Sequence, residues 1–548
     1  MSAALLRGFT LLIVAATAAF AQDQAHDVEW PTYHGDHTGR HHSPLTQITT
    51  ANVKNLSLAW IYRLNTSTTG AIMGGSGPEP QAPTGGGFGP SGRAVDVKGI
   101  PLVVDGVMYV TTTNHVWALD ARTGDEIWHY LWKGRSAIGN RGVGIAGQWL
   151  YFMTADNSIV SLDARTGKER WAKALASPDA PNISTVAPIV IGKQVIIGVG
   201  GDSGTDTPSW VESRDIESGE QIWKWRTVPG PGEPGIETWP SPEVAAQSAA
   251  APWQPPTYDP ELNLLYVPTG QPTPTYNGKG REGANLYSSS IVALNPQTGK
   301  MVWYYQTSPH DTHDWDATQV TVLLDGVIDG RPRRLLAQTN RNGYYFLLDR
   351  TDGKPIASRP FGLVNAYKPG RDERGQLIPD PAKEASPPGS LVFPSQEGVA
   401  NYPAQSYSPQ TGLFYVNATN SGSIFYLPRD ASDPTGFGRS SEWHIGLFDS
   451  SLLALDYRTG DVKWRHRYEH RIGFWSSTHP GVLTTAGGLL FTGDPSGNFI
   501  AFDAANGDIL WHARLGTIVT NSPQTYMLDG TQYVTAAAGD LLFAFALN

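Results

Sequence analysis

The sequence predicts an all-β protein built from repeated small sheets, and three observations support this fold class. The 548 residues include 60 Gly and 41 Pro, an excess of turn-forming residues that disfavours helical bundles. No segment keeps a 3.6-residue hydrophobic period, whereas β-branched and aromatic runs bounded by Gly, Pro, Asn and Asp recur throughout. One short phrase also returns along the chain with a fixed internal spacing. The 18 Trp, 22 Tyr and 17 Phe supply enough apolar surface for a sizeable core, which excludes a disordered chain.

The N-terminal residues 1–21 have the pattern of a secretory signal peptide. They contain one basic residue, Arg7, an apolar stretch over 9–20 and the small-x-small ending Ala-Phe-Ala at 19–21. A transmembrane anchor is the alternative, but the apolar stretch is shorter than the roughly 20 residues that cross a bilayer. We therefore expect cleavage after Ala21 and a periplasmic protein that does not span a membrane.

A cluster of four histidines follows in the next stretch, at His34, His37, His41 and His42. Such a cluster could indicate a metal site. It lies in a polar, Gly-containing segment with no strand or helix pattern to fix its geometry. We therefore expect a solvated segment.

The repeated phrase is an Asp or Asn, a few residues, a Gly, and a Trp eight positions after the first residue. Six copies begin at Asp120, Asp163, Asp215, Asn295, Asp456 and Asp503. A seventh copy, at Asp349, keeps the turn but has Ala357 in place of the Trp. Because β-type residues precede each copy, the phrase predicts a strand, a turn and a second strand. The Trp residues are expected to dock between adjacent sheets and not to contact a cofactor.

The repeats predict an eight-bladed β-propeller, a single domain over residues 22–548. Most intervals between copies are close to the roughly 40–50 residues of a four-stranded blade. The long interval after Asp215 is explained by an insertion over about 227–254. The interval from Asp349 to Asp456 is expected to hold two blades, the degenerate one at 407–416. The C-terminal run 532–536 is expected to close the ring with strands near 56–62, which hides the sheet edges.

Charge and cysteine content exclude several functions. With 40 basic and 50 acidic residues the chain has a net charge of −10, which gives no electrostatic footprint for nucleic acid. The chain contains no cysteine. Disulfides, Cys-ligated zinc, Fe–S clusters, thiol catalysis and covalently attached haem are therefore excluded.

Several phrases, in order along the chain, carry a family resemblance. They are Trp-Pro-Thr-Tyr at 30–33, Asn-Val-Lys-Asn-Leu at 52–56, the Trp repeats, and Ala-Gly-Gly-Leu-Leu-Phe-Thr-Gly-Asp at 486–494. Together they make the chain similar to the quinoprotein alcohol dehydrogenases over essentially its whole mature length. The resemblance implies an eight-bladed propeller that carries pyrroloquinoline quinone (PQQ) and a metal ion, calcium or a lanthanide, on its axis.

The most informative segment, 308–316, holds three carboxylates and two imidazoles. The resemblance implies that Asp314 is the catalytic base, which takes the hydroxyl proton of the alcohol beside the metal. Asp316 resembles the second Asp of lanthanide-using methanol dehydrogenases. If the segment is extended, Asp314 and Asp316 point to one side, so both carboxylates reach one ion. A solvated acidic loop is the alternative.

Other family positions match one by one. Arg341 matches the Arg that polarises the quinone oxygens, and Trp253 matches the Trp that stacks under the cofactor. The positions that match PQQ contacts are Arg141, Thr185 and Asn401. The metal ligands besides the quinone match Asp202 and Gln271, where the family usually has Glu and Asn. Lys98 stands where a Glu often contacts PQQ and could pair with a PQQ carboxylate.

These features predict a periplasmic, PQQ-dependent dehydrogenase that oxidises a small-molecule alcohol to an aldehyde or ketone by hydride transfer to the quinone. Because the chain has no cysteine to attach haem, it would pass its electrons to a separate cytochrome c or another external acceptor. It also lacks the adjacent-cysteine ring that many members place against the cofactor. A cofactor-free propeller that acts as an assembly or interaction scaffold is the alternative. The polar axial residues distinguish the two, because a scaffold has no reason to keep them.

Overall fold

The computed structural model describes residues 28–77, 96–134, 140–177, 180, 182–201, 207–427, 441–469 and 480–548. The predicted signal peptide, residues 1–21, and Asp202 lie outside the described residues. None of the helices in the described ranges has the length and apolar character needed to cross a membrane.

In the described residues, eight sheets of at least four strands, each with a four-stranded antiparallel blade, form the fold, which confirms the predicted all-β, eight-bladed propeller. Seven blades follow one another along the chain. The first blade consists of β4 (Leu102–Val104), β5 (Val107–Thr112), β6 (His115–Asp120) and β7 (Glu126–Trp132). The second consists of β8 (Gly144–Ala146), β9 (Trp149–Met153), β10 (Ser158–Asp163) and β11 (Glu169–Ala174). The third consists of β13 (Ile189–Ile191), β14 (Gln194–Gly201), β15 (Trp210–Asp215) and β16 (Gln221–Arg226). The next two are β17 (Thr257–Asp259), β18 (Leu264–Pro268), β19 (Ser290–Leu294) and β20 (Met301–Gln306); and β21 (Val322–Ile328), β22 (Arg331–Thr339), β23 (Tyr344–Asp349) and β24 (Pro355–Pro360). The last two are β28 (Ser406–Ser408), β29 (Leu413–Tyr426), β30 (Ser441–Asp456) and β31 (Val462–Arg467); and β32 (Leu483–Thr485), β33 (Leu489–Gly493), β34 (Asn498–Asp503) and β35 (Ile509–Arg514).

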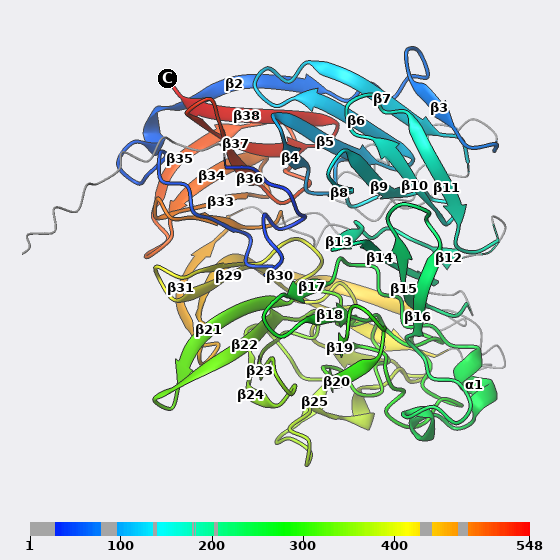
Figure 1. The fold of residues 1–548 in the computed structure, drawn as a ribbon. Coiled ribbons are helices and arrows are strands. Elements are labelled where there is room, and N and C mark those ends of the chain that lie inside the picture. The colour runs from blue at the N-terminus through cyan, green and yellow to red at the C-terminus, as the bar shows by residue number, and fades with distance from the viewer. Residues whose placement is uncertain are drawn as a thin grey trace, which may run out of the picture.

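Strands from both ends of the chain form the eighth blade. It consists of β36 (Gln524–Leu528), β37 (Thr531–Ala538), β38 (Leu541–Leu547) and β2 (Leu56–Arg63), and Figure 1 shows β2 beside β38. Ring closure between the ends of the chain is therefore confirmed. The shorter elements are β1 (His42–Ser43), η1 (Val53–Asn55), β3 (Ile72–Gly74), β12 (Asn182–Ile183), η2 (Ile236–Thr238), α1 (Pro242–Ala246), β25 (Tyr367–Lys368), β26 (Ile378–Pro379), η3 (Pro381–Lys383) and β27 (Ser390–Val392).

The prediction that two blades lie between Asp349 and Asp456 is wrong. Residues 407–416 form no blade of their own, because β28 and β29 pair in the same sheet as β30, which ends at Asp456. The extra length is used by the β25–β26 pair and by the long hairpin β29–β30. The insertion predicted at 227–254 does contain η2 and α1, between the blades that end with β16 and begin with β17. The count of eight is correct because the closing sheet supplies the eighth blade.

The repeated Trp and Gly residues hold neighbouring blades together. The Trp128 indole donates to the carbonyl of Ala164 at 3.0 Å, and Trp223 donates to Pro296 at 2.8 Å. Each ring lies over the repeat Gly of the next blade, so a Cβ added at Gly167 would stand 2.7 Å from Trp128. The expected docking role of these Trp residues is confirmed.

The blade with Ala357 in place of Trp has a substitute contact. Tyr345 of β23 donates its hydroxyl to the carbonyl of Tyr457 at 2.5 Å, and a Cβ at Gly460 would lie 2.7 Å from its ring. A tyrosine from the adjacent strand therefore fills the position that the missing Trp leaves.

A repeat glycine and a turn glycine outside the repeats give a stability prediction. Gly124 has φ +77°, and an added Cβ would lie 2.6 Å from the Trp60 ring. Gly530 has φ +76° and nothing within 4 Å of such a Cβ. Gly530→Ala is expected to cost about 1–2 kcal/mol from backbone strain alone, and Gly124→Ala about 3 kcal/mol because overpacking adds to it. Chemical denaturation of both variants measures the difference, and equal losses would contradict this account of the docking contact.

The predicted solvated histidine segment is wrong. Residues 28–43, here called the N-terminal strap, cross the inner strands of the propeller, and His34 and His41 are 4% and 0% exposed. His41 Nε2 lies 2.6 Å from the Pro523 carbonyl, and His42 Nδ1 lies 2.8 Å from Thr484 Oγ1. The sequence pattern missed this because the strap bonds to strands that are remote in the chain and has no periodicity of its own.

Candidate functional site

The candidate site residues come from loops at one end of the propeller axis. Arg141, Thr185 and Trp253 lie in loops that precede the inner strands β8, β13 and β17, while Gln271 and Arg341 lie just after β18 and β22. In an antiparallel blade the start of the first strand and the end of the second lie at the same edge. The repeat topology therefore brings residues far apart in the sequence to one place.

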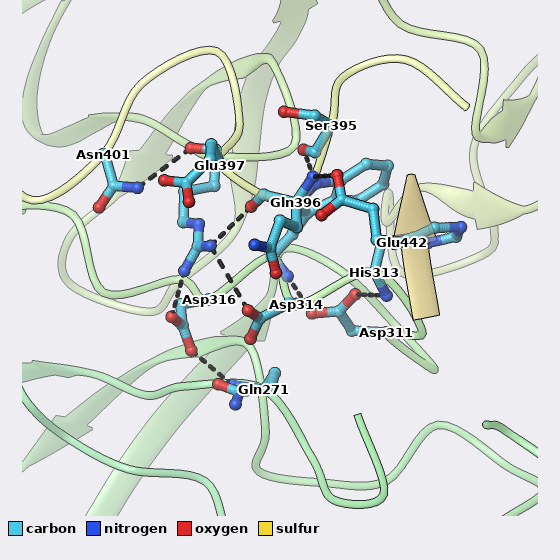
Figure 2. Close-up of polar contacts among 12 residues, drawn as sticks. Gln271, Asp311, His313, Asp314, Asp316, Ser395, Gln396, Glu397, Asn401 and Glu442 are labelled. Atoms are coloured by element: carbon cyan, nitrogen blue, oxygen red, sulfur yellow. Dashed lines mark hydrogen bonds and ion pairs between the residues drawn. The ribbon is translucent and has the colours of Figure 1, made fainter. Parts of the chain in front are cut away.

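Arg341 is the central charge of this site. Its Nη1 donates to Asp316 Oδ2 at 2.6 Å, its Nη2 lies 3.7 Å from Asp314 Oδ2, and Nη2 also donates to the Gln396 carbonyl at 2.6 Å (Figure 2). Burial alone would lower the pKa of Arg341, but the charges of Asp314 and Asp316 outweigh it and raise the pKa above its usual range. The guanidinium is thus a fixed cation between two buried carboxylates.

The Asp316 carboxylate accepts hydrogen bonds from three different segments of the chain. Its Oδ1 accepts the backbone N–H of Gln271 at 2.7 Å, and its Oδ2 accepts the Trp253 indole N–H at 3.2 Å besides Arg341. Burial raises the pKa of Asp316 to about 6, although the Arg341 charge opposes this rise. Oδ2 is filled by two donors, whereas Oδ1 accepts one of the donors described, which leaves it a second lone pair.

The segment that carries both aspartates is not extended, as the expectation had assumed, but bends around the Asp311 carboxylate. Asp314 has a left-handed φ of +66°. The cause is the Asp311 carboxylate, which accepts the backbone N–H of His313 at 2.9 Å and of Trp315 at 2.7 Å. Asp314 and Asp316 nevertheless both face Arg341, while Trp315 is 1% exposed and packs into the core. The alternative of a solvated acidic loop is also excluded, because Asp314 and Asp316 are 8% and 3% exposed.

Trp253, Arg141 and Thr185 form one contact group. The Arg141 guanidinium carbon lies 4.5 Å from the centroid of the Trp253 ring, and its Nη1 donates to Thr185 Oγ1. Thr185 Oγ1 in turn lies 3.4 Å from the Trp253 carbonyl oxygen. Tyr402, which the sequence reasoning missed, lies 4.9 Å from the Arg141 guanidinium and edge-on to Trp253. Its position directly after Asn401 was the signal that could have identified it.

The hydrogen bonds described for Asn401 are to residues of its own loop and not to the other candidate site residues. Its side-chain Nδ2 donates to the Glu397 carbonyl at 3.0 Å (Figure 2), and its Oδ1 accepts the N–H of Tyr402 at 2.8 Å. It therefore shapes the loop that carries Gln396 and Tyr402. A direct cofactor contact by Asn401 stays a prediction.

A second group of residues, which the sequence reasoning missed, holds the Gln396 backbone that binds Arg341. Glu442 Oε1 accepts the N–H of Gln396 at 3.3 Å and the Ser423 hydroxyl, and the Tyr276 hydroxyl donates to the Gln396 side chain. The Gln396 carbonyl is the acceptor of Arg341 Nη2. Glu442 comes from the hairpin β29–β30, whose extension beyond the blade no repeat pattern indicates.

Burial raises the pKa of Glu442 to about 6, and its hydrogen bonds from Ser423 and Gln396 only partly oppose this. A carboxyl group with a raised native pKa adds most to stability below its unfolded value of about 4.5, and the contribution is lost as pH rises through about 6. Glu442→Gln is therefore expected to stabilise the protein by about 1–2 kcal/mol at pH 8, with the gain vanishing below about pH 4.5. Denaturation curves across this pH range measure the gain, and a gain that does not change with pH would contradict the assignment.

The described residues fit an acidic, planar cofactor. Arg341 Nε and Arg141 Nε are buried N–H donors without an acceptor in the described part of the chain. Burial and the nearby Arg141 charge lower the pKa of Lys98 to about 8, so two buried cations lie near each other. A tricarboxylic quinone such as PQQ would offer acceptors to the two arginine N–H groups and negative charge to the two cations.

For a metal ion the donor set is of the right chemical type but incomplete. Asp314, Asp316 and Gln271 offer the oxygen atoms that hard cations prefer. In the ranges that the structure describes, no group of three or more His, Cys, Asp or Glu residues is placed to hold an ion. Asp202, the remaining predicted ligand, falls outside these ranges.

Comparisons with known proteins identify the family of this chain. The family model described as the glucose/ethanol/alcohol dehydrogenase β-propeller domain (PQQ) matches residues 30–360 and 470–534. The quinohemoprotein alcohol dehydrogenase of Comamonas testosteroni is 35% identical, over 93% of this chain and 72% of the relative. The 1-butanol dehydrogenase (cytochrome c) of Thauera butanivorans is 34% identical, over 97% of this chain and 77% of the relative. The solved structure of a europium-containing methanol dehydrogenase has a TM-score of 0.80 and 26% identity, and covers 95% of this chain and 98% of that chain. The chain belongs to the PQQ-dependent quinoprotein alcohol dehydrogenases.

Proposed function

We propose that this chain oxidises a small-molecule alcohol to an aldehyde or ketone with PQQ and a metal ion bound at the end of the propeller axis. One observation carries the proposal. Arg341 lies between Asp314 and Asp316, and the Trp253 indole donates to the same Asp316. The proposed base, the polarising Arg341 cation and the flat Trp253 ring are thereby connected through contacts to Arg341 and the buried Asp316 carboxylate.

When bound, PQQ supplies a quinone carbonyl that accepts hydride from the alcohol carbon, while calcium or a lanthanide acts as a Lewis acid. Trp253 would support the flat face of PQQ, with Arg141, Thr185 and Asn401 at its polar edge. Asp314, Asp316, Gln271 and Asp202 would hold the ion.

Asp314 would act as the general base. Its carboxylate oxygen would take the hydroxyl proton of the alcohol, and the Arg341 cation nearby favours the ionised form that this requires. Because Arg341 is held by Asp316 and the Gln396 carbonyl, it keeps its position as charge develops, which is how a preorganised cation lowers a barrier.

The proposal includes export and an external electron acceptor. Residues 1–21 have the pattern of a signal peptide, which supports export of the mature chain to the periplasm. The chain has no cysteine for covalent haem, and the name of one relative includes cytochrome c. A separate cytochrome c, or another acceptor, is therefore the proposed partner.

Reconstitution tests the function. The purified protein is loaded with PQQ and either calcium or europium, and dye reduction is followed with methanol, ethanol and 1-butanol. We expect turnover that needs PQQ, a metal and an alcohol together. Neither turnover nor PQQ retention with any metal would contradict the proposal and favour the scaffold alternative.

A charge-neutral change at Asp316 tests its part in metal choice. Asp316→Asn keeps an oxygen that accepts hydrogen bonds but removes the negative charge that suits a trivalent ion. We expect europium-supported turnover to fall at least about tenfold more than calcium-supported turnover, about 1.4 kcal/mol of selectivity. Equal losses with both metals would assign Asp316 to positioning Arg341 alone.

A further inference from the structure

The N-terminal strap concentrates histidines in a buried segment. Four of the 14 histidines in the chain fall within it, namely His34, His37, His41 and His42. The rings of His34 and His41 are buried and lie edge to face, with 5.6 Å between their centroids. A positive charge on one ring would therefore act directly on the other, with little solvent to screen it.

His34 and His41 have no acceptor for an added proton. His41 Nε2 lies 2.6 Å from the Pro523 carbonyl oxygen, and because a carbonyl can only accept, this nitrogen carries the proton of the neutral ring. His41 Nδ1 and both ring nitrogens of His34 are buried without a hydrogen-bond partner in the described part of the protein. A second proton on either ring would create a buried N–H without an acceptor, at a cost in free energy.

The rings that surround this pair are neutral. The Tyr33 ring centroid lies 4.7 Å from that of His34, and the Trp30 ring centroid lies 5.1 Å from that of His41. Burial raises the pKa of Tyr33 above its usual range, so its hydroxyl stays protonated. Neither ring offers a negative charge to an imidazolium.

The strands that hold His41 are also uncharged where they meet it. β28 presents the Ser406 hydroxyl and β32 the Thr484 N–H, and both donate to the His41 carbonyl. Neither imidazole has a carboxylate among its described hydrogen-bond partners. Burial lowers the pKa of His41 to about 4, and burial together with the nearby His41 holds the pKa of His34 well below its usual value.

The other two strap histidines act in the same direction. Burial, followed by the Arg40 charge, lowers the pKa of His42 to about 4, whereas Asp36 opposes this. Burial also lowers the pKa of His37, again with Asp36 opposing, and the His37 ring lies edge-on to Tyr258. All four histidines therefore bind a proton more weakly in the folded chain than they would in a detached strap.

The strap can detach without opening a blade, because each blade keeps four paired strands when the strap is left out. Beyond the strap, Ile48 and Val53 are fully buried in the core and anchor the chain before β2. The strap itself bonds to six inner strands: β36 through Val28, β4 through Trp30, β17 through His37, β21 through Thr38, β28 through Arg40 and β32 through His42.

The strap also packs against a loop of the candidate site. Tyr33 Cδ2 lies 3.6 Å from the position that a Cβ at Gly142 would take. Gly142 directly follows Arg141, whose charge acts on the buried Tyr33 hydroxyl. Detachment of the strap would therefore remove a packing partner from the loop that carries Arg141.

We propose that acid releases the N-terminal strap: protonation of His34 and His41 detaches residues 28–43 from the inner strands while the eight blades stay folded. Because the folded pKa values lie below the unfolded value of about 6.5, attachment is fully favoured above that pH and weakens as pH falls towards 4. Each histidine that must stay neutral raises the detachment constant by up to about tenfold per pH unit. Release needs neither PQQ nor metal, so it stands or falls independently of the proposed catalysis.

Single-cysteine labelling tests the proposal, since the chain has no cysteine of its own. Ser43→Cys places a thiol in the strap and Ser161→Cys places one in β10, and both serines are buried. Labelling rates with 4,4′-dithiodipyridine are divided by those of the same protein unfolded in urea at the same pH. We expect this ratio to rise by up to about 100-fold from pH 6 to pH 5 for Ser43→Cys, and the Ser161→Cys protein to stay protected.

Two further substitutions in the Ser43→Cys protein remove the titrating groups. His34→Phe keeps a ring that takes no proton, and His41→Gln keeps a donor for the Pro523 carbonyl. Each should reduce the pH dependence by about tenfold per pH unit. His129→Gln is the matched control, because His129 is also a buried histidine but lies on β7 outside the strap, and it should leave the pH dependence of strap labelling unchanged.

Strap labelling that does not change with pH, a pH dependence that both strap variants retain in full, or equal labelling of the two cysteine positions at every pH would each overturn the proposal. If a variant fails to fold, hydrogen exchange of the wild-type protein between pH 6.5 and pH 4.5, corrected for the intrinsic exchange rate, gives an independent answer. Faster exchange confined to peptides within 28–43 supports strap release, and unchanged or uniformly faster exchange refutes it.

Discussion

Asp314→Asn is expected to lower kcat of the reconstituted protein by about 10²–10⁴-fold while PQQ stays bound. Asparagine has nearly the same shape but no basic oxygen to take the hydroxyl proton. Because Arg341 is also held by Asp316 and by the Gln396 carbonyl, the cation should keep its place in the variant. Steady-state dye reduction gives kcat, and absorbance of the bound quinone gives its occupancy.

A matched control is Asp259→Asn, another buried carboxylate paired with an arginine, Arg350, at 2.6 Å. It should reduce stability without changing kcat, because it lies at the other end of its blade from the site. If Asp314→Asn keeps more than a tenth of the wild-type kcat, Asp314 is not the base.

Arg341→Lys is expected to reduce kcat by about 10²–10³-fold. Lysine keeps the positive charge, but a single ammonium does not reach Asp316, Asp314 and the Gln396 carbonyl together as the guanidinium does. The same change should also weaken the contacts that fix the segment carrying Asp314 and Asp316. Parallel measurements of kcat, KM and PQQ affinity separate the loss of polarisation from the loss of cofactor.

The control for this variant is Arg350→Lys. Arg350 is also buried and pairs with Asp259 and Asp325, but it lies outside the candidate site. It should lower thermal stability and leave kcat unchanged. An equal fall in kcat in both variants would mean that a general loss of stability, and not polarisation by Arg341, causes the effect.

The propeller was predictable because its determinants are local in the sequence. The spacing from Asp120 to Trp128 encodes a strand, a turn and a docking residue within one hairpin, and each copy repeats it. The interval from Asp349 to Asp456 was wrongly predicted to hold two blades, because β28 to β30 carry one repeat over a much longer stretch. Inserted hairpins change the interval but not the number of sheets.

The site was predictable as a set of positions but not as a geometry. The approach of Asp314 and Asp316 to Arg341 depends on the Asp311 turn, and the support from Glu442 depends on a long hairpin folding over the blade. Burial of His34 depends on a strap that crosses six other strands. These are long-range contacts between irregular segments, and neither hydrophobic periodicity nor turn composition records them.

The most direct test of the central claim is a crystal structure of the protein reconstituted with PQQ and a lanthanide, with data collected at the lanthanide absorption edge. The account predicts a planar quinone on the Trp253 ring and one anomalous peak within about 2.3–2.6 Å of an Asp314 oxygen, the ligand distance of a large hard cation. An ion bound elsewhere, or a quinone that does not contact Trp253, would contradict it.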